Sequence, residues 1–589
     1  MRSFLTTFLA SCLGVIASFA LIFFILVGMA VSGMMSKPGV SSNSVLKLKL
    51  ESVVPEQTDN VNKDFAFMGS QDESLGLRRV TRLIEHAASD KKISGILIEN
   101  TSVSVGQATL LSIIQSLEKF KESGKFIYSY GDSHTQSSYL LCSVADSMFV
   151  NPHGMLDLRG YGTAIPFYKN MLDKIGVEMD IFYAGDFKSA TEPFRLTEMS
   201  EASKLQTREF LNDMNSIFKE IVGKNRNLAP EAIDSIISNF EGRTALRAKN
   251  AGLVDELLYK DQLEDFLKSK LSVKPDKKIK YISLSKYNNL TELKDHSKGK
   301  DKIAVVFTEG EIIYGSDDAG IISEKKYLNI LNKIRNDKTI KAVVLRVNSP
   351  GGNAFSSEVI WREIERIKES GKPVIASFGD YAASGGYYIA AGADSIVTQP
   401  NTLTGSIGVF MMLPNATKLL NEKIGINFDT IKTHPYAAGF SPMLKLTENE
   451  KAVLQEMTLD IYELFVKRVS EGRSLSTDST KVLARGRVWT GRKAVELGLA
   501  DVVGDLNDAI RIAAEKAGLE KYKIVEYPFI EPDFLSTILK DINRSKGDEI
   551  ARILTTSEER KLYQQFLEMK AILRCKDPHA RLPFVFDFN

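Results

Sequence analysis

Two side chains far apart in the sequence, Ser384 and Lys188, are the best candidates for catalytic chemistry. A serine hydroxyl is a weak nucleophile and needs a neighbouring base to take its proton. A lysine amine can be that base only when it is neutral, so burial must lower its pKa from about 10.4. Apolar residues Ile181–Tyr183 and Phe187 precede Lys188 and are typical of such a buried site. Because Asp186 would oppose the shift, we expect its side chain to point away.

Glycines next to the serine suggest how a negatively charged intermediate would be stabilised. Backbone N–H groups can bind the oxyanion of a tetrahedral intermediate, and glycine lets the backbone approach a substrate closely. Gly351 and Gly352 follow an apolar strand, and Gly385 directly follows Ser384 at the expected start of a helix. These three glycines are the candidate oxyanion donors. Ser406 is a candidate supporting hydroxyl.

The chain contains a long internal duplication. The pentapeptide KESGK occurs at Lys121–Lys125 and again at Lys368–Lys372. The tripeptide ADS occurs at Ala145–Ser147 and again at Ala393–Ser395, with nearly the same shift in residue number. A shared order of landmarks over this length predicts two homologous domains.

The candidate residues lie where the two copies differ. Gln136 stands opposite Ser384, Leu158 opposite Ser406, and Ala437 opposite Lys188. The paired glycines also occur only in the second copy. Each copy lacks the candidate residues that the other retains, so we expect one complete site at an interface between two domains. The sequence leaves open whether that interface lies within one chain or between chains.

Each copy alternates apolar runs with amphipathic helical segments, as in residues 341–347, 357–371 and 373–378. This alternation predicts βαβ units around a largely parallel sheet, hence an α/β fold. We expect a first α/β domain at 46–298, which supplies the lysine, and a second at 299–530, which supplies the serine. A helical extension should follow at 531–589.

The segment 1–45 should anchor the protein in a membrane. Residues 3–36 carry no charge and exceed the roughly 20 residues that cross a bilayer. A cleaved signal peptide is the alternative, but its apolar core would be only about 7–15 residues long. Flanking charges specify the orientation weakly, and we expect the N-terminus inside and the bulk outside.

Composition excludes several classes of protein. With 76 basic and 74 acidic residues, the net charge of +2 gives no indication of nucleic-acid binding. The three cysteines, Cys12, Cys142 and Cys575, have neither CxxC nor metal-ligand spacing, so we expect no metal site and no cofactor.

Four motifs together resemble the long, duplicated form of the protease IV (signal peptide peptidase) family: Asn348–Gly352, Ala383–Tyr388, Leu403–Gly408 and Phe187–Ala190. The resemblance implies tandem domains of the crotonase/Clp-protease fold after one N-terminal transmembrane helix. It also implies a serine-lysine dyad in which Ser384 is the nucleophile, Lys188 the base and Ser406 an orienting hydroxyl.

The same resemblance implies the oligomeric state, the cellular location and the substrates of the protein. The expected protein is a homotetramer in the bacterial inner membrane, with its catalytic bulk on the periplasmic face. Its expected substrates are remnant signal peptides and other extended chains.

Less specific interpretations remain. Ser384 could be a helix cap, Lys188 a surface charge, and the glycines a simple turn. His434 suggests a triad but its neighbour Pro435 suggests a turn, and Cys142 fits a small buried residue better than a nucleophile. For the whole protein, the alternatives are a catalytically silent membrane scaffold of the same fold and an acyl-CoA enzyme of crotonase type.

Overall fold

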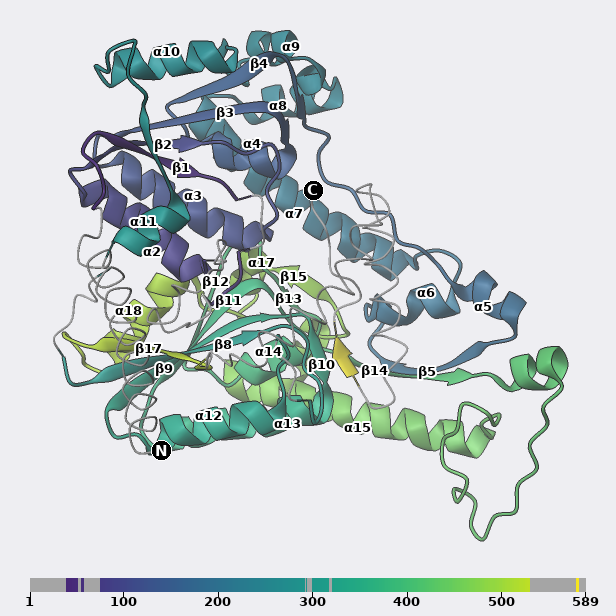
Figure 1. The fold of residues 1–589 in the computed structure, drawn as a ribbon. Coiled ribbons are helices and arrows are strands. Elements are labelled where there is room, and N and C mark those ends of the chain that lie inside the picture. The colour runs from purple at the N-terminus through teal and green to yellow at the C-terminus, as the bar shows by residue number, and fades with distance from the viewer. Residues whose placement is uncertain are drawn as a thin grey trace, which may run out of the picture.

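The structure is a computed structural model that describes residues 39–50, 54–57, 75–291, 293, 299–316, 320–529 and 579–581. Two α/β units, one from each copy, stack on one another, with the first unit uppermost in Figure 1. The expected membrane helix at 3–36 and nearly all of the extension at 531–589 lie outside the described residues. None of the described helices combines the length and the apolar character that crossing a membrane requires.

The first unit is built on a six-stranded sheet whose neighbouring strands are all parallel. In sheet order the strands are β6 (Glu256–Leu257), β4 (Ser147–Asp157), β3 (Phe126–Thr135), β2 (Ile93–Ile98), β1 (Ser44–Leu48) and β7 (Lys280–Ser283). Its helices are α2 (Leu77–Ser89), α3 (Gln107–Lys121), α4 (Gln136–Cys142), α7 (Glu201–Arg226), α8 (Pro230–Ser238), α9 (Ala245–Asn250), α10 (Lys260–Lys270) and α11 (Leu284–Leu290).

Both faces of this sheet are buried, which explains the continuous apolar runs. On β2, Ile96 and Ile98 pack in the same core cluster as the apolar residues of α2 and α3. Leu97 points the other way and packs with Leu263 and Leu267 of α10. Parallel strands covered on both faces show this pattern rather than an alternation of polar and apolar residues.

The second unit is built on an eight-stranded sheet. Its main path is β15 (Val488–Thr490), β13 (Leu403–Gly405), β11 (Val374–Ala383), β9 (Ile340–Ser349), β8 (Lys302–Glu309) and β17 (Lys523–Tyr527). Off this path, β12 (Ser395–Thr398) pairs with β11, and β16 (Val502–Val503) pairs with β12. Its helices include α12 (Glu324–Asn336), α13 (Ala354–Glu369), α14 (Gly385–Ala390), α15 (Glu448–Arg473), α16 (Thr477–Leu483), α17 (Gly491–Glu496) and α18 (Leu506–Lys516).

Strand register confirms the duplication. In the first unit β3 pairs with β4 through Ser133 with Met155 and Thr135 with Asp157. In the second unit β11 pairs with β13 through Tyr381 with Leu403 and Ala383 with Gly405, the same pairs 248 residues later. The alignment that placed Gln136 opposite Ser384 and Leu158 opposite Ser406 is therefore also the structural one.

A third, four-stranded sheet joins the two copies. Its order is β10 (Gly351–Asn353), β18 (His579–Arg581), β14 (Val409–Asn415) and β5 (Glu178–Ala184). Strand β5 belongs to the first copy but pairs antiparallel with β14 of the second. With its flanking helices α5 (Lys169–Ile175) and α6 (Glu192–Arg195), β5 lies well away from the first sheet in Figure 1.

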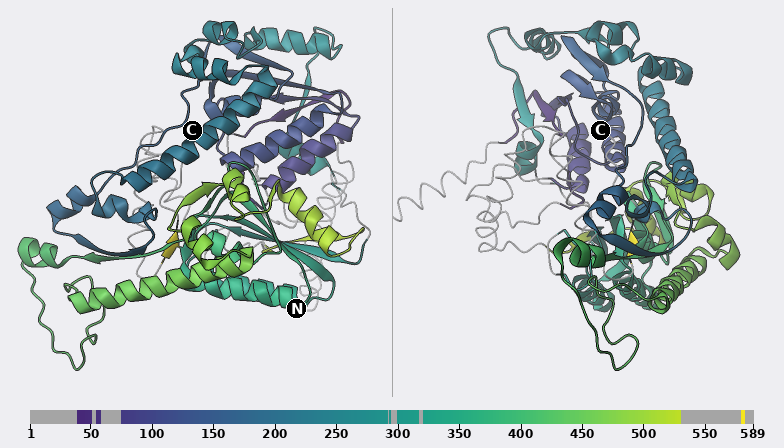
Figure 2. Two further views of the ribbon diagram at one scale, coloured as in Figure 1. Left: turned by 180° about the vertical axis from the view of Figure 1, so that it is seen from behind. Right: turned by 90° about the vertical axis from the view of Figure 1, so that its right-hand side faces the viewer.

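Helix α7 also connects the units and runs diagonally from one to the other in Figure 2. Around its middle, Phe210 and Met214 pack with Ala383 and Leu403 of the second unit. Nearer its end, Phe218 is part of the first unit's core. One rigid helix therefore fixes the relative position of the two cores.

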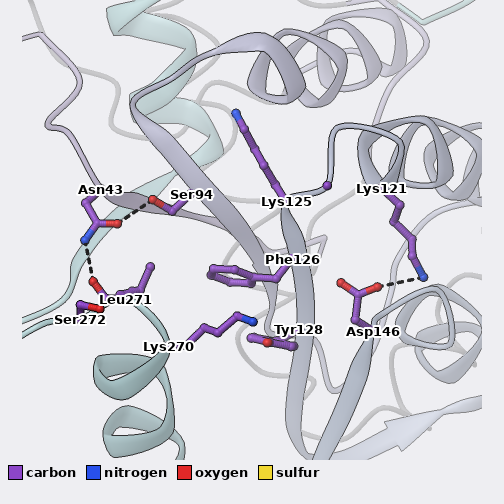
Figure 3. Close-up of a pocket in the computed structure, with 11 residues that line it drawn as sticks. Asn43, Ser94, Lys121, Lys125, Phe126, Tyr128, Asp146, Lys270, Leu271 and Ser272 are labelled. Atoms are coloured by element: carbon purple, nitrogen blue, oxygen red, sulfur yellow. Dashed lines mark hydrogen bonds and ion pairs between the residues drawn. The ribbon is translucent and has the colours of Figure 1, made fainter.

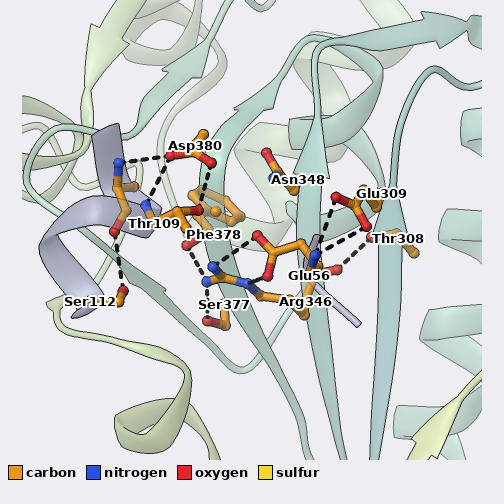
Figure 4. A network of polar contacts seen from close by, with 12 residues as sticks. Glu56, Thr109, Ser112, Thr308, Glu309, Arg346, Asn348, Ser377, Phe378 and Asp380 are labelled. Atoms are coloured by element: carbon orange, nitrogen blue, oxygen red, sulfur yellow. Dashed lines mark hydrogen bonds and ion pairs between the residues drawn. The ribbon is translucent and has the colours of Figure 1, made fainter. Parts of the chain in front are cut away.

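A buried ion pair links a segment that follows β1 of the first unit to the second sheet (Figure 4). Arg346 of β9 donates from Nε to Glu56 Oε2 at 2.8 Å and from Nη2 to Glu56 Oε1 at 3.0 Å. The side chains are only 1% and 2% exposed. The backbone N–H of Glu56 in turn donates to the carboxylate of Glu309, at the end of β8.

A carboxylate of the second unit also caps a helix of the first. Asp380, four residues before Ser384 on β11, accepts from Ala108 N at 2.7 Å and Thr109 N at 3.0 Å at the start of α3. Thr109 Oγ1 adds a third hydrogen bond to the same carboxylate at 2.7 Å. The first N–H groups of a helix have no partner within the helix, and here a carboxylate of the second unit accepts from two of them in the first unit. The cap therefore ties the two units together.

Removing Glu56 should destabilise the protein strongly. Glu56→Ala leaves the buried Arg346 guanidinium without the carboxylate to which it is hydrogen-bonded, which costs roughly 3–5 kcal/mol. We expect calorimetry to show a clearly lower Tm. Glu515→Ala is the control, because the Arg511–Glu515 pair is exposed and should contribute at most about 1 kcal/mol. Equal effects of the two substitutions would contradict the structural role of the buried pair.

Glu309 should make stability depend on pH. Burial, and then the nearby Glu56 carboxylate, raise the pKa of Glu309 from 4.5 to about 7. The folded protein thus holds a proton that the unfolded chain releases, so this group's contribution falls as pH rises from 4.5 to about 7. We expect Glu309→Gln to raise Tm relative to the parent at about pH 8 more than at about pH 5. A constant difference in Tm across that range would refute the raised pKa.

Candidate active site

Ser384 stands at the sharp junction between β11 and α14. Its backbone has φ 55° and ψ −118°, a conformation that costs an L-residue energy and that clusters at functional sites. Its side chain makes no capping hydrogen bond to α14, so the interpretation of Ser384 as an ordinary helix cap is wrong. The residue is completely buried.

Strand pairing places Ser406 beside Ser384. Ala383 and Gly405 are register partners in β11 and β13, so the two serines follow directly from paired residues. Ser384 N donates to Gly405 O at 2.8 Å. Ser406 is also buried and also has a positive φ of 49°. Both hydroxyls thus leave the sheet at the same edge.

The pairing of β5 with β14 brings Lys188 to the same place. Ala184 is the register partner of Val409, so the chain that leaves β5 runs alongside the chain that follows Ser406. Phe187 N then donates to Arg485 O at 2.9 Å and fixes the turn before the lysine. The Lys188 side chain passes inward and is only 1% exposed.

The lysine amine has three close partners. Its Nζ lies 2.7 Å from Ser384 Oγ and 3.0 Å from both Ser406 Oγ and Ser406 O. A neutral amine has two N–H groups and one lone pair. When both N–H groups donate to Ser406, the lone pair faces the Ser384 hydroxyl and can accept its proton. The contact between Lys188 and Ser384 forms within one chain, which answers the question that the sequence left open.

Burial favours the neutral form of this amine. Loss of hydration lowers the pKa of Lys188 well below its ordinary value. Within the described part of the chain no carboxylate forms an ion pair with the amine. Asp186 pairs instead with Arg485, and its side chain is 66% exposed, which confirms that it points away. The site can therefore deprotonate a serine without a histidine.

Two residues that position the lysine were missed by the sequence interpretation. Gly486 has φ +76°, and a Cβ there would lie 2.6 Å from Lys188 Cβ. Gln206 of α7 donates from Nε2 to Phe187 O at 3.0 Å and to Ser189 Oγ at 2.9 Å. A single glycine in a turn and a glutamine in a long helix carry no distinguishing sequence signal. Only the packing reveals them.

The three candidate oxyanion glycines differ in how well their N–H groups are placed to bind a negative charge. Gly385 is the first residue of α14, where no preceding turn offers its N–H a carbonyl. Gly352 lies in β10, where a Cβ would come within 2.0 Å of Ile312 O, so the strand can pass only as glycine. The N–H of Gly351 already donates to Ser349 Oγ at 3.2 Å. Gly385 and Gly352 are the better placed donors.

The other candidate nucleophiles and bases lie elsewhere. His434 is exposed between β14 and α15 and contacts Thr433 Oγ1. Cys142 is buried in the first core, and burial raises the pKa of its thiol to about 12. Among the described residues, no group of three or more His, Cys, Asp and Glu side chains is placed to hold a metal ion.

A surface pocket of the first unit also lies apart from the dyad (Figure 3). Its walls come from the edges of β2, β3, α3 and α10 and include Phe126, Tyr128 and Lys270. Lys121 pairs there with Asp146 at 3.1 Å. None of the residues that surround Lys188 and Ser384 lines this pocket.

Comparisons with known proteins agree with this geometry. The model of peptidase family S49 matches residues 119–274 and 366–520, once in each copy. Protease 4 of Haemophilus influenzae is 32% identical over 517 residues, which cover 85% of this chain and 83% of that protein. The chloroplastic serine protease SPPA of Arabidopsis thaliana is 32% identical over 81% of this chain and 70% of its own length. A putative signal peptide peptidase SppA of Enterococcus faecium is 36% identical over 43% of this chain and 74% of its own length.

Solved structures give shorter matches. A mutant of the 1510-N membrane-bound stomatin-specific protease covers 39% of this chain and 99% of its own, with 16% identity and a TM-score of 0.25. The family match in both copies and the long relatives lead to one conclusion. The chain belongs to peptidase family S49 and is a serine peptidase.

Proposed function

We propose that the protein hydrolyses peptide bonds in extended, apolar chains, above all signal peptides that remain after cleavage. Ser384 is the nucleophile, Lys188 the general base and Ser406 the hydroxyl that orients the lysine. The observation that carries this proposal is the 2.7 Å contact between Lys188 Nζ and Ser384 Oγ in a buried site. A buried lysine so close to a strained serine has no structural purpose that a methionine would not serve better.

The reaction follows from these contacts. Lys188 takes the Ser384 proton as Oγ attacks the substrate carbonyl carbon, and the resulting ammonium gives that proton to the leaving amine. Ser384 is then esterified. A water molecule, deprotonated by the same amine, attacks the ester, releases the carboxylic product and restores the serine. The N–H groups of Gly385 and Gly352 would stabilise the oxyanion in both steps.

The substrate class and cellular setting are part of the proposal. The relative from Enterococcus faecium is named as a putative signal peptide peptidase, which supports the substrate class. The uncharged stretch at 3–36 supports a single-pass anchor in the bacterial inner membrane. We place the peptidase units on the periplasmic face, as a homotetramer of the crotonase/Clp-protease fold.

Substitution of either dyad residue should abolish hydrolysis. We expect Ser384→Ala to lower kcat for a fluorogenic peptide by roughly a million-fold. Lys188→Met, which fills the same space, and Lys188→Arg, which cannot become neutral, should both lose the roughly 10²–10⁴-fold that a positioned base contributes. Lys204→Met, at a lysine in exposed ion pairs, is the control and should leave kcat unchanged.

Retained turnover in purified Ser384→Ala protein would sink the assignment of the nucleophile. A fluorophosphonate probe distinguishes the remaining alternative. If the wild-type protein neither hydrolyses peptides nor takes up the probe at Ser384, the catalytically silent scaffold is the better description.

The rate should rise with pH through the pKa of Lys188, because only the neutral amine accepts a proton. Burial lowers that pKa, so we expect the rising limb of kcat/KM well below pH 10.5, the ordinary lysine value. A limb at or above pH 10.5 would contradict a buried, neutral lysine.

Ser406→Ala keeps the contact between Lys188 and the Ser406 carbonyl but removes one hydrogen-bond acceptor of the amine. The substitution should lower kcat about tenfold with little change in KM. Ser89→Ala, at an exposed serine, is its control.

A further inference from the structure

The connection from α10 to β7 in the first unit is strongly basic. Residues 268–280, with the sequence KSKLSVKPDKKIK, contain six lysines and one aspartate and so carry a net charge of +5, in a chain whose total is +2. Lys270, Lys274 and Lys278 are exposed, and among the described residues they have no ion-pair partner. We call residues 268–280 the basic segment. In Figure 1 α10, where it begins, lies at the end of the first unit that is remote from the second.

The fold does not require this charge. The second copy makes the same connection from α18 to β17, and both β7 and β17 are strands that pair in parallel with the first strand of their sheet. The corresponding residues 514–523 contain three lysines and two glutamates, a net charge of +1. Like charges so close together repel one another and disfavour the compact state. The lysines of the basic segment therefore point to a partner outside the fold.

The start of the described chain is held against the basic segment. Ser44, the first residue of β1, is the register partner of Lys280. Asn43 donates from Nδ2 to Leu271 O at 3.1 Å, and Lys280 Nζ donates to Ser42 O at 3.3 Å. The basic segment thus lies beside the point where the chain enters the first unit.

The expected membrane anchor reaches this same point. The uncharged stretch ends at Ser36, three residues before Gly39, and three residues of extended chain span at most about 11 Å. A further exposed lysine, Lys92, lies there, because a Cβ on Gly39 would be 3.6 Å from its Nζ. Electrostatic attraction acts over a Debye length of about 8 Å at physiological salt. Lipid headgroups around the anchor are therefore the charged surface within reach of these lysines.

The pocket of Figure 3 adjoins the basic segment and offers one cation to an anionic ligand. Of its three lysines, Lys121 pairs with a carboxylate, and Lys125 donates to backbone carbonyls at the end of α2. Lys270 has no such partner within the described part of the chain. Phe126 and Tyr128, whose rings stack with centroids 4.6 Å apart, line the same pocket. An amine beside an apolar wall suits the phosphate and glycerol of a lipid headgroup.

We propose that the basic segment binds the anionic lipid headgroups of the membrane that holds the chain, with one headgroup phosphate at Lys270 in the adjacent pocket. The inference rests on the membrane anchor of the proposed function and not on the dyad. Each lysine near an anionic membrane surface strengthens binding about fivefold. Several lysines together hold this face of the first unit against the bilayer, so that the peptidase units keep one orientation to the membrane.

The test measures how close the basic segment lies to lipid headgroups. Full-length protein with Ser269→Cys, at an exposed serine of the segment, carries a fluorophore in a background where the native cysteines are alanine. It is placed in nanodiscs of phosphatidylcholine, with or without phosphatidylglycerol, that contain a lipid with a nitroxide on its headgroup. We expect strong quenching with phosphatidylglycerol, weak quenching without it, and loss of the difference at about 1 M salt.

A charge-removing variant identifies the lysines. It replaces four lysines of the basic segment: Lys270→Gln, Lys274→Gln, Lys277→Gln and Lys278→Gln. The matched control makes the same change of charge at four exposed lysines of the second unit: Lys333→Gln, Lys338→Gln, Lys467→Gln and Lys516→Gln. The first variant should lower quenching to the level seen in phosphatidylcholine, and the control should behave as wild type. Equal quenching in the two lipids, or quenching that the first variant leaves unchanged, would overturn the inference.

Two further measurements separate this inference from the proposed function. Hydrolysis of a soluble fluorogenic peptide should have the same kcat in both variants as in wild type, because the replaced lysines are remote from the dyad. Loss of hydrolysis in every protein, with the lipid dependence of quenching retained, would count against the proposed peptidase alone.

Protein that does not insert into bilayers would contradict the anchor, and vesicle co-sedimentation then tests the basic segment. Binding to vesicles that contain phosphatidylglycerol, weakened on the order of a hundredfold in the basic-segment variant, would support the inference. Equal binding to vesicles with and without phosphatidylglycerol would overturn it.

Discussion

A lysine can act as a base at a serine only if it is kept away from water, and the architecture around Lys188 serves that condition. No carboxylate of the described residues pairs with the amine, and burial is what lowers its pKa. Three oxygen atoms from two serines satisfy its hydrogen-bonding groups. Enclosing a side chain this long takes walls from several elements: the turn after β5, the strands β11 and β13, and the turn at Gly486, where no Cβ fits.

Division of the site between two copies follows from the same requirement. Lys188 belongs to the first copy, whereas Ser384 and Ser406 belong to the second, so neither copy alone has the complete site. The pairing of β5 from the first copy with β14 from the second brings the two parts together. Helix α7, the Arg346–Glu56 pair and the cap on α3 by Asp380 hold the units in one arrangement. Because Asp380 lies on β11 and Ser384 directly follows the end of that strand, one strand positions both the interface and the nucleophile.

Much of this could be read from the sequence, and the rest could not for physical reasons. The duplication, the α/β units and the opposed losses of Ser384 and Lys188 are patterns of residue type, which a sequence displays directly. The partner of β5 is not, because its strand pairs with residues more than two hundred positions away and any extended apolar segment offers the same backbone groups. Gly486 and Gln206 act through a single backbone angle and a few hydrogen bonds, and β18 through backbone pairing alone. None of these leaves a pattern in residue types.

The most direct test of the account is to change the basicity of the amine at position 188 without changing its place. Lys188→Cys, made in a background without Cys12, Cys142 and Cys575, can be alkylated to thialysine, whose amine is less basic than that of lysine. We expect the unmodified variant to be inactive, alkylation to restore peptide hydrolysis, and the rising limb of kcat/KM to move to lower pH than in the wild type. Restored activity with an unmoved limb, or no restoration in a folded and fully alkylated protein, would contradict the assignment of Lys188 as the base.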